Sequence, residues 1–375
     1  MPIEFATSPR STVGIEWEIA IVDRADGELA NVAEPVLARF APTPGHPPFV
    51  TSELLANTIE LVSGPHSRVG GAVTDLMHLL DDVRGAVQGL GRYDLICSGS
   101  HPYSQWYNQR LTDKPRYHEL INRTRWWGRN MMIWGVHVHV GVEDRRKVLP
   151  LVNGMLVYLP HLLALSASSP YWAGVETGYA SNRSLMFQNL PTAGLPFDFT
   201  DWESFERYVA DLVKTGVIAD HTEVRWDIRP SPRWGTIEFR VCDGVSTAAE
   251  IASLAALVQC LVDWLSARLD AGLDVPVLQP WFVRENKWRA ARYGLDAEII
   301  TDASGSERLV GDDLRELVAT LTPTAERLGC TAELNHVTDT LEHGGSYQRQ
   351  LRVAAANGGD LTAVVAHLAE ELRRG

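Results

Sequence analysis

Five segments of the chain alternate apolar and polar residues with a period of two, the pattern of β-strands that bury one face. They are residues 12–22, 58–62, 134–142, 223–229 and 236–241. A shorter strand is predicted at 93–97. None of these runs is continuously apolar, as the strands of a parallel sheet covered on both faces would be. We therefore expect an antiparallel sheet with one face on the core and one polar, concave or solvent-lined face.

Apolar residues at helical spacing occupy most of the chain between and after these strands. Helices are predicted over 69–90, 115–127, 145–165 with a bend near Pro160, 201–215 with Asp201 as N-cap, 247–269, and most of 280–375. Residues 168–196 show neither pattern, and an irregular connection of that length inside a compact domain is usually functional. The pattern indicates an α+β fold. We expect one domain over 1–375, with a helix-rich C-terminal part from about residue 280.

Charge and cysteine usage exclude several classes of protein. The formal net charge of −13 argues against nucleic-acid binding, because such binders usually present a basic face. Polar residues interrupt the apolar stretches 149–165 and 251–265, so we expect buried helices there and no membrane span. The four cysteines form no CxxC pair, and the N-terminus lacks the basic start and apolar run of a signal peptide. We therefore expect a cytoplasmic protein without a nucleic-acid or membrane partner. The sequence leaves the oligomeric state open and is compatible with a homodimer.

The first predicted strand carries a pair of acidic residues at its polar positions. Glu16 and Glu18 lie two residues apart, so both side chains point to the same face. Two neighbouring carboxylates in the middle of a strand repel each other unless a cation lies between them. A solvated strand face is the commoner origin of such a pair, and a pair of ligands for a hard metal ion is the alternative.

Polar residues recur at the same spacing in or beside the other strands. They are Glu53, Glu60, His137, His139, Arg225, Asp227, Arg229, Glu238 and Arg240. If these strands are neighbours, one face of the sheet collects carboxylates, histidines and arginines. Carboxylate-rich sites select Mg²⁺ or Mn²⁺, and arginine binds phosphate or carboxylate in bidentate fashion. This face therefore suits a nucleoside triphosphate bound together with Mg²⁺.

The motifs of other common sites are absent from the sequence. It contains no G-x-x-x-x-G-K-[ST] loop, no complete G-x-G-x-x-G fingerprint, no G-x-S-x-G elbow and no H-E-x-x-H pair. Cys242 lies two residues after Arg240, but a buried, small apolar role is commoner for such a cysteine than catalysis.

Several short motifs follow one another in a recognisable order. The chain contains GIEWE at 14–18, Glu53 followed by TIE at 58–60, GVHVHVG at 135–141 and TIEFR at 236–240. It also contains SHP at 100–102, QRL at 109–111, ENKWRA at 285–290 and RYG at 292–294. This order and spacing resembles the type 2 glutamate–cysteine ligases, a family of carboxylate–amine ligases. The resemblance covers roughly residues 10–295, and the residues after about 300 are not matched.

The resemblance implies a fold similar to the catalytic domain of glutamine synthetase. In that fold helices cover the convex side of a curved antiparallel sheet, and ATP with Mg²⁺ binds in the concavity. The positions that match the family's metal ligands are Glu16, Glu18, Glu53, Glu60, His137 and Glu238. Arg240 matches an arginine beside the transferring phosphate or the substrate carboxylate, and we expect it to be catalytic. We expect His139 to contact metal or substrate, and Asn182, Arg183 and Arg229 to contact substrate.

The implied reaction is the ATP-dependent ligation of a carboxylate to an amine through an acyl phosphate. The expected cofactors are ATP and Mg²⁺, with Mn²⁺ as an alternative metal, and the expected partners are amino acids and ATP. The expected substrate pair is L-glutamate and L-cysteine, which would give γ-glutamylcysteine, and another amine is compatible with the sequence. One alternative is a phosphotransferase of the guanidino-kinase kind, which makes no amide. The other is a nucleotide- or metal-binding protein without turnover.

Overall fold

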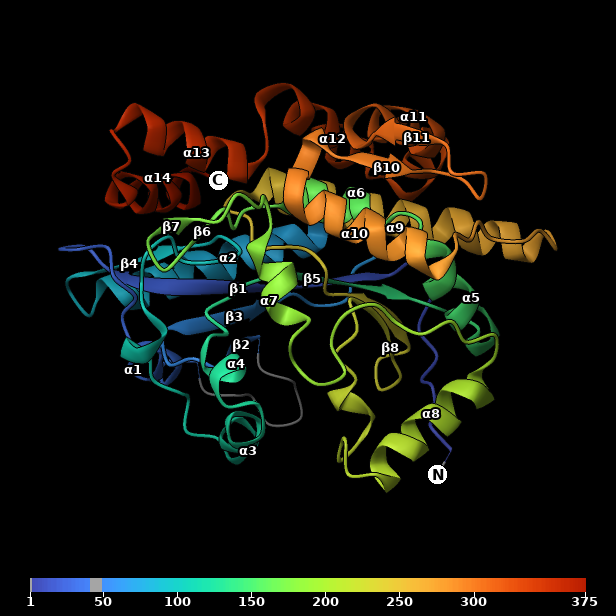
Figure 1. Ribbon diagram of the computed structural model, residues 1–375, viewed down its shortest axis with the longest axis horizontal. Helices are drawn as coiled ribbons and strands as arrows, with labels where there is room; N and C mark the ends of the chain where they lie inside the picture. Colours follow the sequence, from blue (N-terminus) through green and yellow to red (C-terminus); the bar gives the residue numbers. More distant parts are fainter. Residues whose placement is uncertain (1, 41–48) are drawn as a thin grey trace.

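Within residues 2–40 and 49–375, which the computed structural model describes, seven strands form one antiparallel sheet (Figure 1). The strands are β1 (Val13–Asp23), β2 (Val50–Ser52), β3 (Thr58–Val62), β4 (Tyr93–Ile96), β5 (Val136–Gly141), β8 (Ile228–Ser231) and β9 (Thr236–Phe239). Their order is β2-β3-β1-β5-β9-β8, and β4 also pairs with β1. The antiparallel pairing confirms the sheet type that the alternation predicted.

The long strand β1 organises the sheet. Its residues 16–20 pair with β3, whereas 13–17 pair with β5 and 20–23 pair with β4 on the other edge. Because successive side chains of β1 point to opposite faces of the sheet, the strand has an apolar face and a polar face. Ile15, Trp17 and Ile19 are fully buried against helices, and Glu16 and Glu18 point to the opposite face.

Two long helices cover the apolar face of the sheet. They are α2 (Val69–Gln88) and α9 (Ala248–Asp270). Thr247 caps α9, since its side-chain oxygen accepts a hydrogen bond from the backbone N–H of Glu250. Among the described residues, α9 is the one helix that is by itself long and apolar enough to cross a membrane, and 83% of its apolar window is buried in the fold. It is therefore a core helix, as predicted.

Further helices and a hairpin form an outer layer beyond α9 and around its ends (Figure 1). They are α5 (Arg145–Met155), α6 (Leu159–Ser166), α10 (Pro280–Tyr293), α11 (Val310–Leu328), α12 (Thr331–His343), α13 (Ser346–Ala356), α14 (Leu361–Arg374), β10 (Glu298–Ile300) and β11 (Glu307–Leu309). Contacts between buried apolar side chains continue from Ile3 to Leu372, so the helix-rich C-terminal part shares its core with the sheet.

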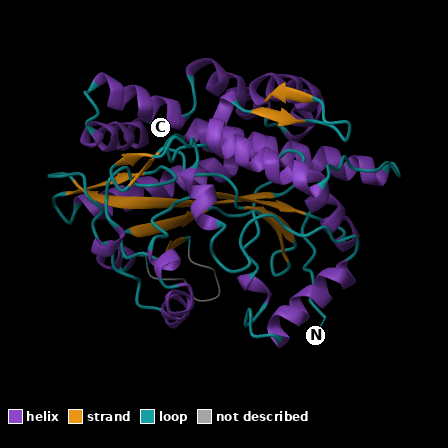
Figure 2. Cartoon of the chain, viewed as in Figure 1, coloured by secondary structure: helices purple, strands orange, loops and turns teal. Residues whose placement is uncertain are grey.

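The polar face of the sheet is flanked by short helices and by loops (Figure 2). These elements are α1 (Ala33–Leu37), α3 (Pro115–Thr124), α4 (Trp126–Arg129), α7 (Asn182–Phe187), α8 (Trp202–Lys214) and short 3₁₀ turns at Trp106–Asn108 and His221–Glu223. The hairpin of β6 (Tyr171–Trp172) and β7 (Val175–Glu176) is drawn beside α13 and α14 in Figure 1, and a third 3₁₀ turn, Gly294–Asp296, packs against α6, α10 and α11. Figure 1 shows α3, α4 and α8 on the opposite side of the sheet from α9 and α12. The elements on the side of the polar face are thus mostly loops and short helices, whereas the main helical layers lie on the apolar face.

Three sequence-based predictions differ from the structure, and a fourth is confirmed. The strand predicted at 223–229 starts too early, because Asp220 caps a 3₁₀ turn at His221–Glu223 and β8 begins only at Ile228. The helix predicted over 115–127 is divided at Arg125, whose φ of 52° breaks the helical path. The bend predicted near Pro160 in 145–165 is confirmed, because the chain turns by 63° between Met155 and Leu159 and Pro160 occupies the first turn of α6. Residues 168–196 contain α7 and a two-stranded hairpin, so they are not wholly irregular.

Candidate active site

Strand register brings the predicted site residues together on the polar face. Glu16 lies opposite His137, and Glu18 lies opposite Glu60. His139 lies opposite Glu238, which in turn lies opposite Arg229 on β8. Ligand atoms of Glu16, His137 and Glu238 all lie within 4.8 Å of one another, and the same holds for Glu18, Glu60 and His137. His137 therefore joins two overlapping groups of potential metal ligands.

One side of this cluster, the arginine half, consists of Glu238, Arg229 and Arg240. Arg229 donates from Nε to Glu238 Oε2 at 2.7 Å and from Nη2 to Oε1 at 3.2 Å, and Arg240 Nη1 also contacts Oε1. Burial by itself would raise the pKa of Glu238, but Arg229 and Arg240 hold this pKa far below its ordinary value. Glu238 in turn raises the pKa of Arg240 against the effect of burial. The Glu238 carboxylate and the Arg240 guanidinium are therefore both charged.

The two histidines connect the arginine half to Glu16. His137 Nδ1 lies 3.0 Å from Glu16 Oε2, and His139 Nε2 lies 3.2 Å from Oε1. Burial opposes ionisation of Glu16, but His139 and His137 keep its pKa well below the ordinary value. Burial, with Arg240, lowers the pKa of His137 to about 4. The His139 pKa is raised, because Glu238 and Glu16 together outweigh burial. A neutral His137 is available as a nitrogen ligand.

The opposite side, the carboxylate half, consists of Glu18, Glu53 and Glu60. Burial and the charge of Glu53 raise the pKa of Glu18 to about 8. Burial also raises the pKa of Glu53, and burial with the charge of Glu16 raises that of Glu60 well above the ordinary value. In the described part of the chain, the salt bridges of this polar face end on Glu16 or Glu238 and not on these three residues.

The donor set of the carboxylate half fits a hard divalent cation. Several carboxylate oxygens converge there, and no basic side chain of residues 2–40 or 49–375 lies at salt-bridge distance from them. Such a group is costly to bury as free anions. A bound cation would remove the repulsion and favour the ionised form of each carboxylate. Oxygen donors with a neutral imidazole suit Mg²⁺ or Mn²⁺ better than a soft metal ion.

The residues expected from the loop 168–196 take supporting positions. Arg183 is buried, and its guanidinium donates to the backbone oxygens of Arg240 at 3.3 Å and Val241 at 3.4 Å. A side chain on Gly135 would overlap this guanidinium, so the glycine is required for close packing. Asn182 is the half-buried first residue of α7, and its N–H donates to the Ser169 oxygen at 3.2 Å. The substrate contacts of Asn182 and Arg183 stay predictions.

Two residues from the run 223–229 do not join the cluster. Asp227 forms a buried ion pair with Lys287 of α10 at 2.7 Å, and Arg225 pairs with Glu223 at 3.4 Å. The physical reason is the turn at His221–Glu223, which removes the regular alternation on which their expected placement depended. Cys242 is buried as expected, and burial raises its pKa to about 12.

Two kinds of residue near the cluster were not predicted from the sequence. Lys114 and Arg116, at the start of α3, bring positive charge to the carboxylate half, and Arg116 offsets part of the effect of burial on the pKa of Glu53. Their signal is local charge: residues 110–129 contain six Lys or Arg and two Asp or Glu in a chain of net charge −13. Phe187 of α7 was also missed, although its ring centre lies 5.8 Å from the guanidinium of Arg240 and 5.9 Å from that of Arg183.

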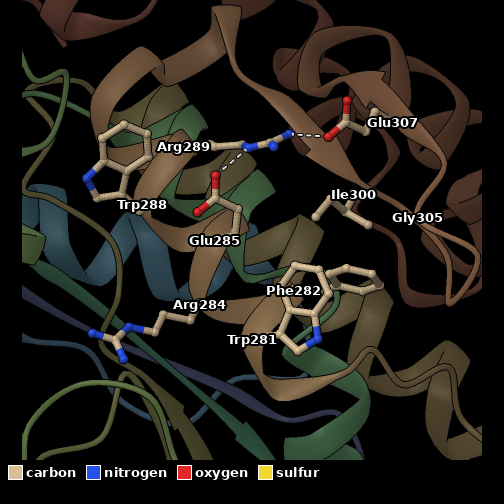
Figure 3. Close-up of a pocket in the computed structure, with 9 residues that line it drawn as sticks. All are labelled: Trp281, Phe282, Arg284, Glu285, Trp288, Arg289, Ile300, Gly305 and Glu307. Atoms are coloured by element: carbon tan, nitrogen blue, oxygen red, sulfur yellow. Dashed lines mark hydrogen bonds and ion pairs between the residues drawn. The ribbon is translucent and has the colours of Figure 1, made fainter.

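An open pocket of about 900 Å³ lies apart from this cluster, between α10 and the β10–β11 hairpin (Figure 3). None of the convergent residues lines it. Arg289 projects between two acidic residues there, at 2.9 Å from Glu285 and 2.6 Å from Glu307. Because Arg289 already pairs with both acidic side chains of this pocket, the polar face of the sheet remains the candidate active site.

Sequence comparison relates this chain to proteins of one family. Residues 12–367 match the model of glutamate-cysteine ligase family 2 (GCS2). A protein of Clavibacter sepedonicus named "Putative glutamate–cysteine ligase 2" is 62% identical over 376 residues, covering 100% of this chain and 98% of the relative. A protein of the same name from Leifsonia xyli subsp. xyli is 58% identical over 374 residues, covering 100% of this chain and 99% of the relative.

Two solved structures share the fold at low sequence identity. A bifunctional glutathione synthetase from Pasteurella multocida gives a TM-score of 0.69 at 18% identity, over 97% of this chain and 52% of that one. A glutamate–cysteine ligase from Francisella tularensis, solved in complex with AMP, gives a TM-score of 0.68 at 13% identity, over 99% of this chain and 94% of that one. These likenesses confirm the predicted α+β class with its curved antiparallel sheet.

Proposed function

The chain belongs to glutamate-cysteine ligase family 2 and is an ATP-dependent carboxylate–amine ligase, and we propose that it joins the γ-carboxylate of L-glutamate to the amine of L-cysteine. The observation that carries the proposal is the division of one buried cluster into two halves. The arginine half offers fixed positive charge beside Glu238, and the carboxylate half offers oxygen ligands that form no salt bridge with any described residue. An enzyme that must align a carboxylate with a triphosphate needs both kinds of group.

The reaction requires activation of a poor acyl donor. A carboxylate oxygen of glutamate attacks the γ-phosphorus of ATP, and the bond from this phosphorus to the bridging oxygen of ADP breaks. The amine then attacks the carbonyl carbon of the resulting acyl phosphate, loses a proton and displaces phosphate. No protein nucleophile takes part, so the protein contributes alignment and electrostatic stabilisation. Another amine in place of cysteine would follow the same steps.

Each part of the site has a proposed role in these steps. Arg240 contacts the transferring phosphoryl group or the substrate carboxylate and stabilises the charge that develops there. Arg229 keeps Glu238 ionised and oriented, because it forms two hydrogen bonds to that carboxylate. His139 contacts metal or substrate from its place between Glu16 and Glu238. Asn182, Arg183 and Arg229 are proposed as substrate contacts.

We assign the metal ligands to carboxylates of both halves and to Glu16 and His137, which lie between them. The full set is Glu16, Glu18, Glu53, Glu60, His137 and Glu238. Mg²⁺ bound by them, or Mn²⁺ in its place, would neutralise the phosphate charges and hold the triphosphate in line with the acceptor carboxylate. The shared core from Ile3 to Leu372 supports the proposal of one ligase domain over 1–375. A cytoplasmic location suits a reaction that consumes ATP and a free thiol.

Product analysis tests the proposal against its alternatives. The protein is incubated with Mg²⁺-ATP, L-glutamate and L-cysteine, and products are identified by mass. Amide, ADP and phosphate in equal amounts support the ligase, and replacing cysteine with other amines defines the acceptor. A phosphorylated amino acid or guanidine without an amide would indicate a phosphotransferase. The absence of any ATP turnover, together with binding of Mg²⁺-ATP, would indicate a binding protein.

A further inference from the structure

A buried ion pair links the outer helix α10 to the segment before β8. Lys287 Nζ donates to Asp227 Oδ2 at 2.7 Å, and the two side chains are only 5% and 3% exposed. Lysine and aspartate are almost never fully buried unless they are paired. Each charge therefore depends on the other, and the pair fixes the distance between α10 and the segment that contains Asp227.

The backbone of Asp227 carries this link to Arg240. The Asp227 carbonyl accepts a hydrogen bond from the Arg240 N–H at 2.8 Å, and the Asp227 N–H donates to the Gly194 oxygen at 2.8 Å. The Arg240 carbonyl accepts from both terminal nitrogens of Arg183 at 3.3 Å. Both backbone groups of Arg240 are thus held, and one of them is held by a residue whose side chain is anchored on α10.

Arg240 depends on this contact because the regular sheet ends beside it. Strand β9 ends at Phe239, and its last paired residue on β8 is Ile228. The side chain of Arg240 bonds to Glu238 through Nη1, while its Nε is buried without a partner among the described residues. The backbone contact with Asp227 is therefore a major restraint on where the guanidinium lies.

Helix α10 is a firm anchor for Lys287. Asn286 donates to the Ile300 oxygen and accepts from the Ile300 N–H, both at 2.7 Å, so the helix is bonded to β10. Arg289 adds its two ion pairs to Glu285 and Glu307 at the open pocket (Figure 3). Bonded to the hairpin at two successive turns, α10 has little freedom to follow a movement of the sheet edge.

We propose that Lys287 and Asp227 are positioning residues that hold Arg240 in its working place. This inference rests on the proposed role of Arg240 in ligation, and neither Lys287 nor Asp227 is assigned a contact with substrate. It gives the ENKWRA segment of α10 a function in the reaction that acts through the backbone of β9.

Steady-state kinetics of Lys287→Met provides the first test. Methionine removes the ammonium but keeps most of the side-chain volume, so Asp227 loses its partner. We expect kcat to fall about 10- to 100-fold, because small displacements of a positioned group cost rate. We expect KM for Mg²⁺-ATP and glutamate to change less than about threefold, since ground-state contacts remain. Lys287→Arg should recover part of kcat, and Asp227→Asn, which keeps an acceptor for Lys287, should show a smaller loss in the same direction.

The matched control weakens another buried contact that lies outside the polar face. Asp313→Asn removes the carboxylate charge from the 2.7 Å contact between Asp313 and His161, whose side chain is only 2% exposed. We expect it to lower the melting temperature as Lys287→Met does, but to leave kcat within about twofold of wild type because it touches neither β8 nor β9. An equal kcat loss in this control would mean that general destabilisation explains the effect, and would overturn the inference.

Hydrogen–deuterium exchange of the whole protein separates this inference from the proposed function. We expect the Arg240 amide, followed in peptides that cover 236–243, to exchange faster in Lys287→Met and unchanged in Asp313→Asn. Unchanged exchange in Lys287→Met would overturn the inference, and so would faster exchange with an unchanged kcat. If the wild-type protein forms no amide, the proposed function fails, while the exchange data still decide whether Lys287 holds Arg240.

Discussion

The arginine half and the carboxylate half lie on the same polar face and are similarly buried, yet their carboxyl groups behave in opposite ways. Two arginines hold the pKa of Glu238 far below its ordinary value, whereas burial and mutual repulsion raise the pKa of Glu18 to about 8. The neighbouring charges, and not the extent of burial, decide whether the pKa of each carboxyl group is raised or lowered. The carboxylate of the arginine half is already paired with two guanidinium groups. The carboxylate half requires a cation that no residue in the described part of the chain supplies at contact distance.

This difference assigns different tasks to the two halves. A preformed pair of guanidinium groups can meet a developing negative charge without rearrangement. A group of carboxylates with raised pKa values is ready to exchange protons for a divalent metal ion.

The largest expected effect is on activity, and it should be the same in both halves. Glu60→Gln removes a ligand from the carboxylate half, and Glu238→Gln removes the anion that orients both arginines. We expect each to lower amine-dependent phosphate release by about a hundredfold or more, as for other preorganised electrostatic groups. Glu307→Gln, at the open pocket, is the control and should keep wild-type activity. More than a tenth of wild-type activity in either site variant would remove that residue from the proposed machinery.

In the metal-free protein, substitutions in the two halves should change the free energy of unfolding in opposite directions. Glu238→Gln leaves Arg229 and Arg240 buried without their anion, which should lower the free energy of unfolding by about 3–5 kcal/mol. Glu60→Gln removes a group that the fold must either protonate or bury as a charge, so it should raise this free energy by about 1–3 kcal/mol near pH 7. Urea unfolding with EDTA present measures both. Changes of the same sign would contradict the division into two halves.

The pH dependence of stability in the metal-free protein should reflect the raised pKa values of the carboxylate half. The pKa of Glu18 is about 8 in the fold against an ordinary value of 4.5, so between these values the folded state binds a proton that the unfolded state lacks. Its contribution therefore makes stability fall as pH rises from about 5 to 8, by up to about 1.4 kcal/mol per pH unit. Glu238, with its lowered pKa, contributes stability above about pH 4.5 that is lost only as pH falls below that value.

Comparison of wild type with Glu18→Gln isolates this effect. Urea unfolding in EDTA at several values between pH 5.5 and 8 should show a steeper decline in the wild type than in the variant. The apparent affinity for Mg²⁺, followed by the shift in melting temperature, should instead rise with pH in the wild type, because metal binding displaces protons. Parallel stability curves would show that Glu18 ionises normally in the fold.

The smallest expected effect belongs to a residue outside both halves. Cys242 is buried, and burial raises its pKa to about 12, so it is a thiol and not a thiolate at neutral pH. Since the proposed reaction needs no protein nucleophile, Cys242→Ala should keep activity within about threefold while losing about 1 kcal/mol of stability. Initial rates at saturating substrate, compared with Cys97→Ala, check this expectation. A loss of activity specific to Cys242 would give the thiol a role that the account lacks.

The sequence predicted the strands of the site better than their surroundings. Apolar and polar residues alternate regularly in 12–22 and 134–142, so the two-residue period of a strand predicted that Glu16 and His137 point to the polar face. The segment 223–229 alternates as well, but the Asp220 cap and the ion pair to Lys287 keep residues 223–227 out of the regular strand, which begins at Ile228. Lys287 is 60 residues from Asp227 in the chain, and no local pattern predicts such a tertiary contact.

The division of the cluster into halves was also beyond the sequence. The motifs predicted that carboxylates, histidines and arginines would gather on one face, but not which charges would pair. The pairing depends on register across β8, β9 and β5, where Glu238 lies opposite both Arg229 and His139. Lys114 and Arg116 were missed because they reach the cluster from a helix outside the sheet.

The most direct test of the account follows oxygen from the substrate carboxylate. The protein is given L-glutamate labelled with ¹⁸O in its γ-carboxylate, together with L-cysteine and Mg²⁺-ATP, and the released phosphate is analysed by mass. Transfer through an acyl phosphate predicts one ¹⁸O in the phosphate for each amide formed. Amide formation with unlabelled phosphate would contradict the account, since ATP would then not have activated the glutamate carboxylate.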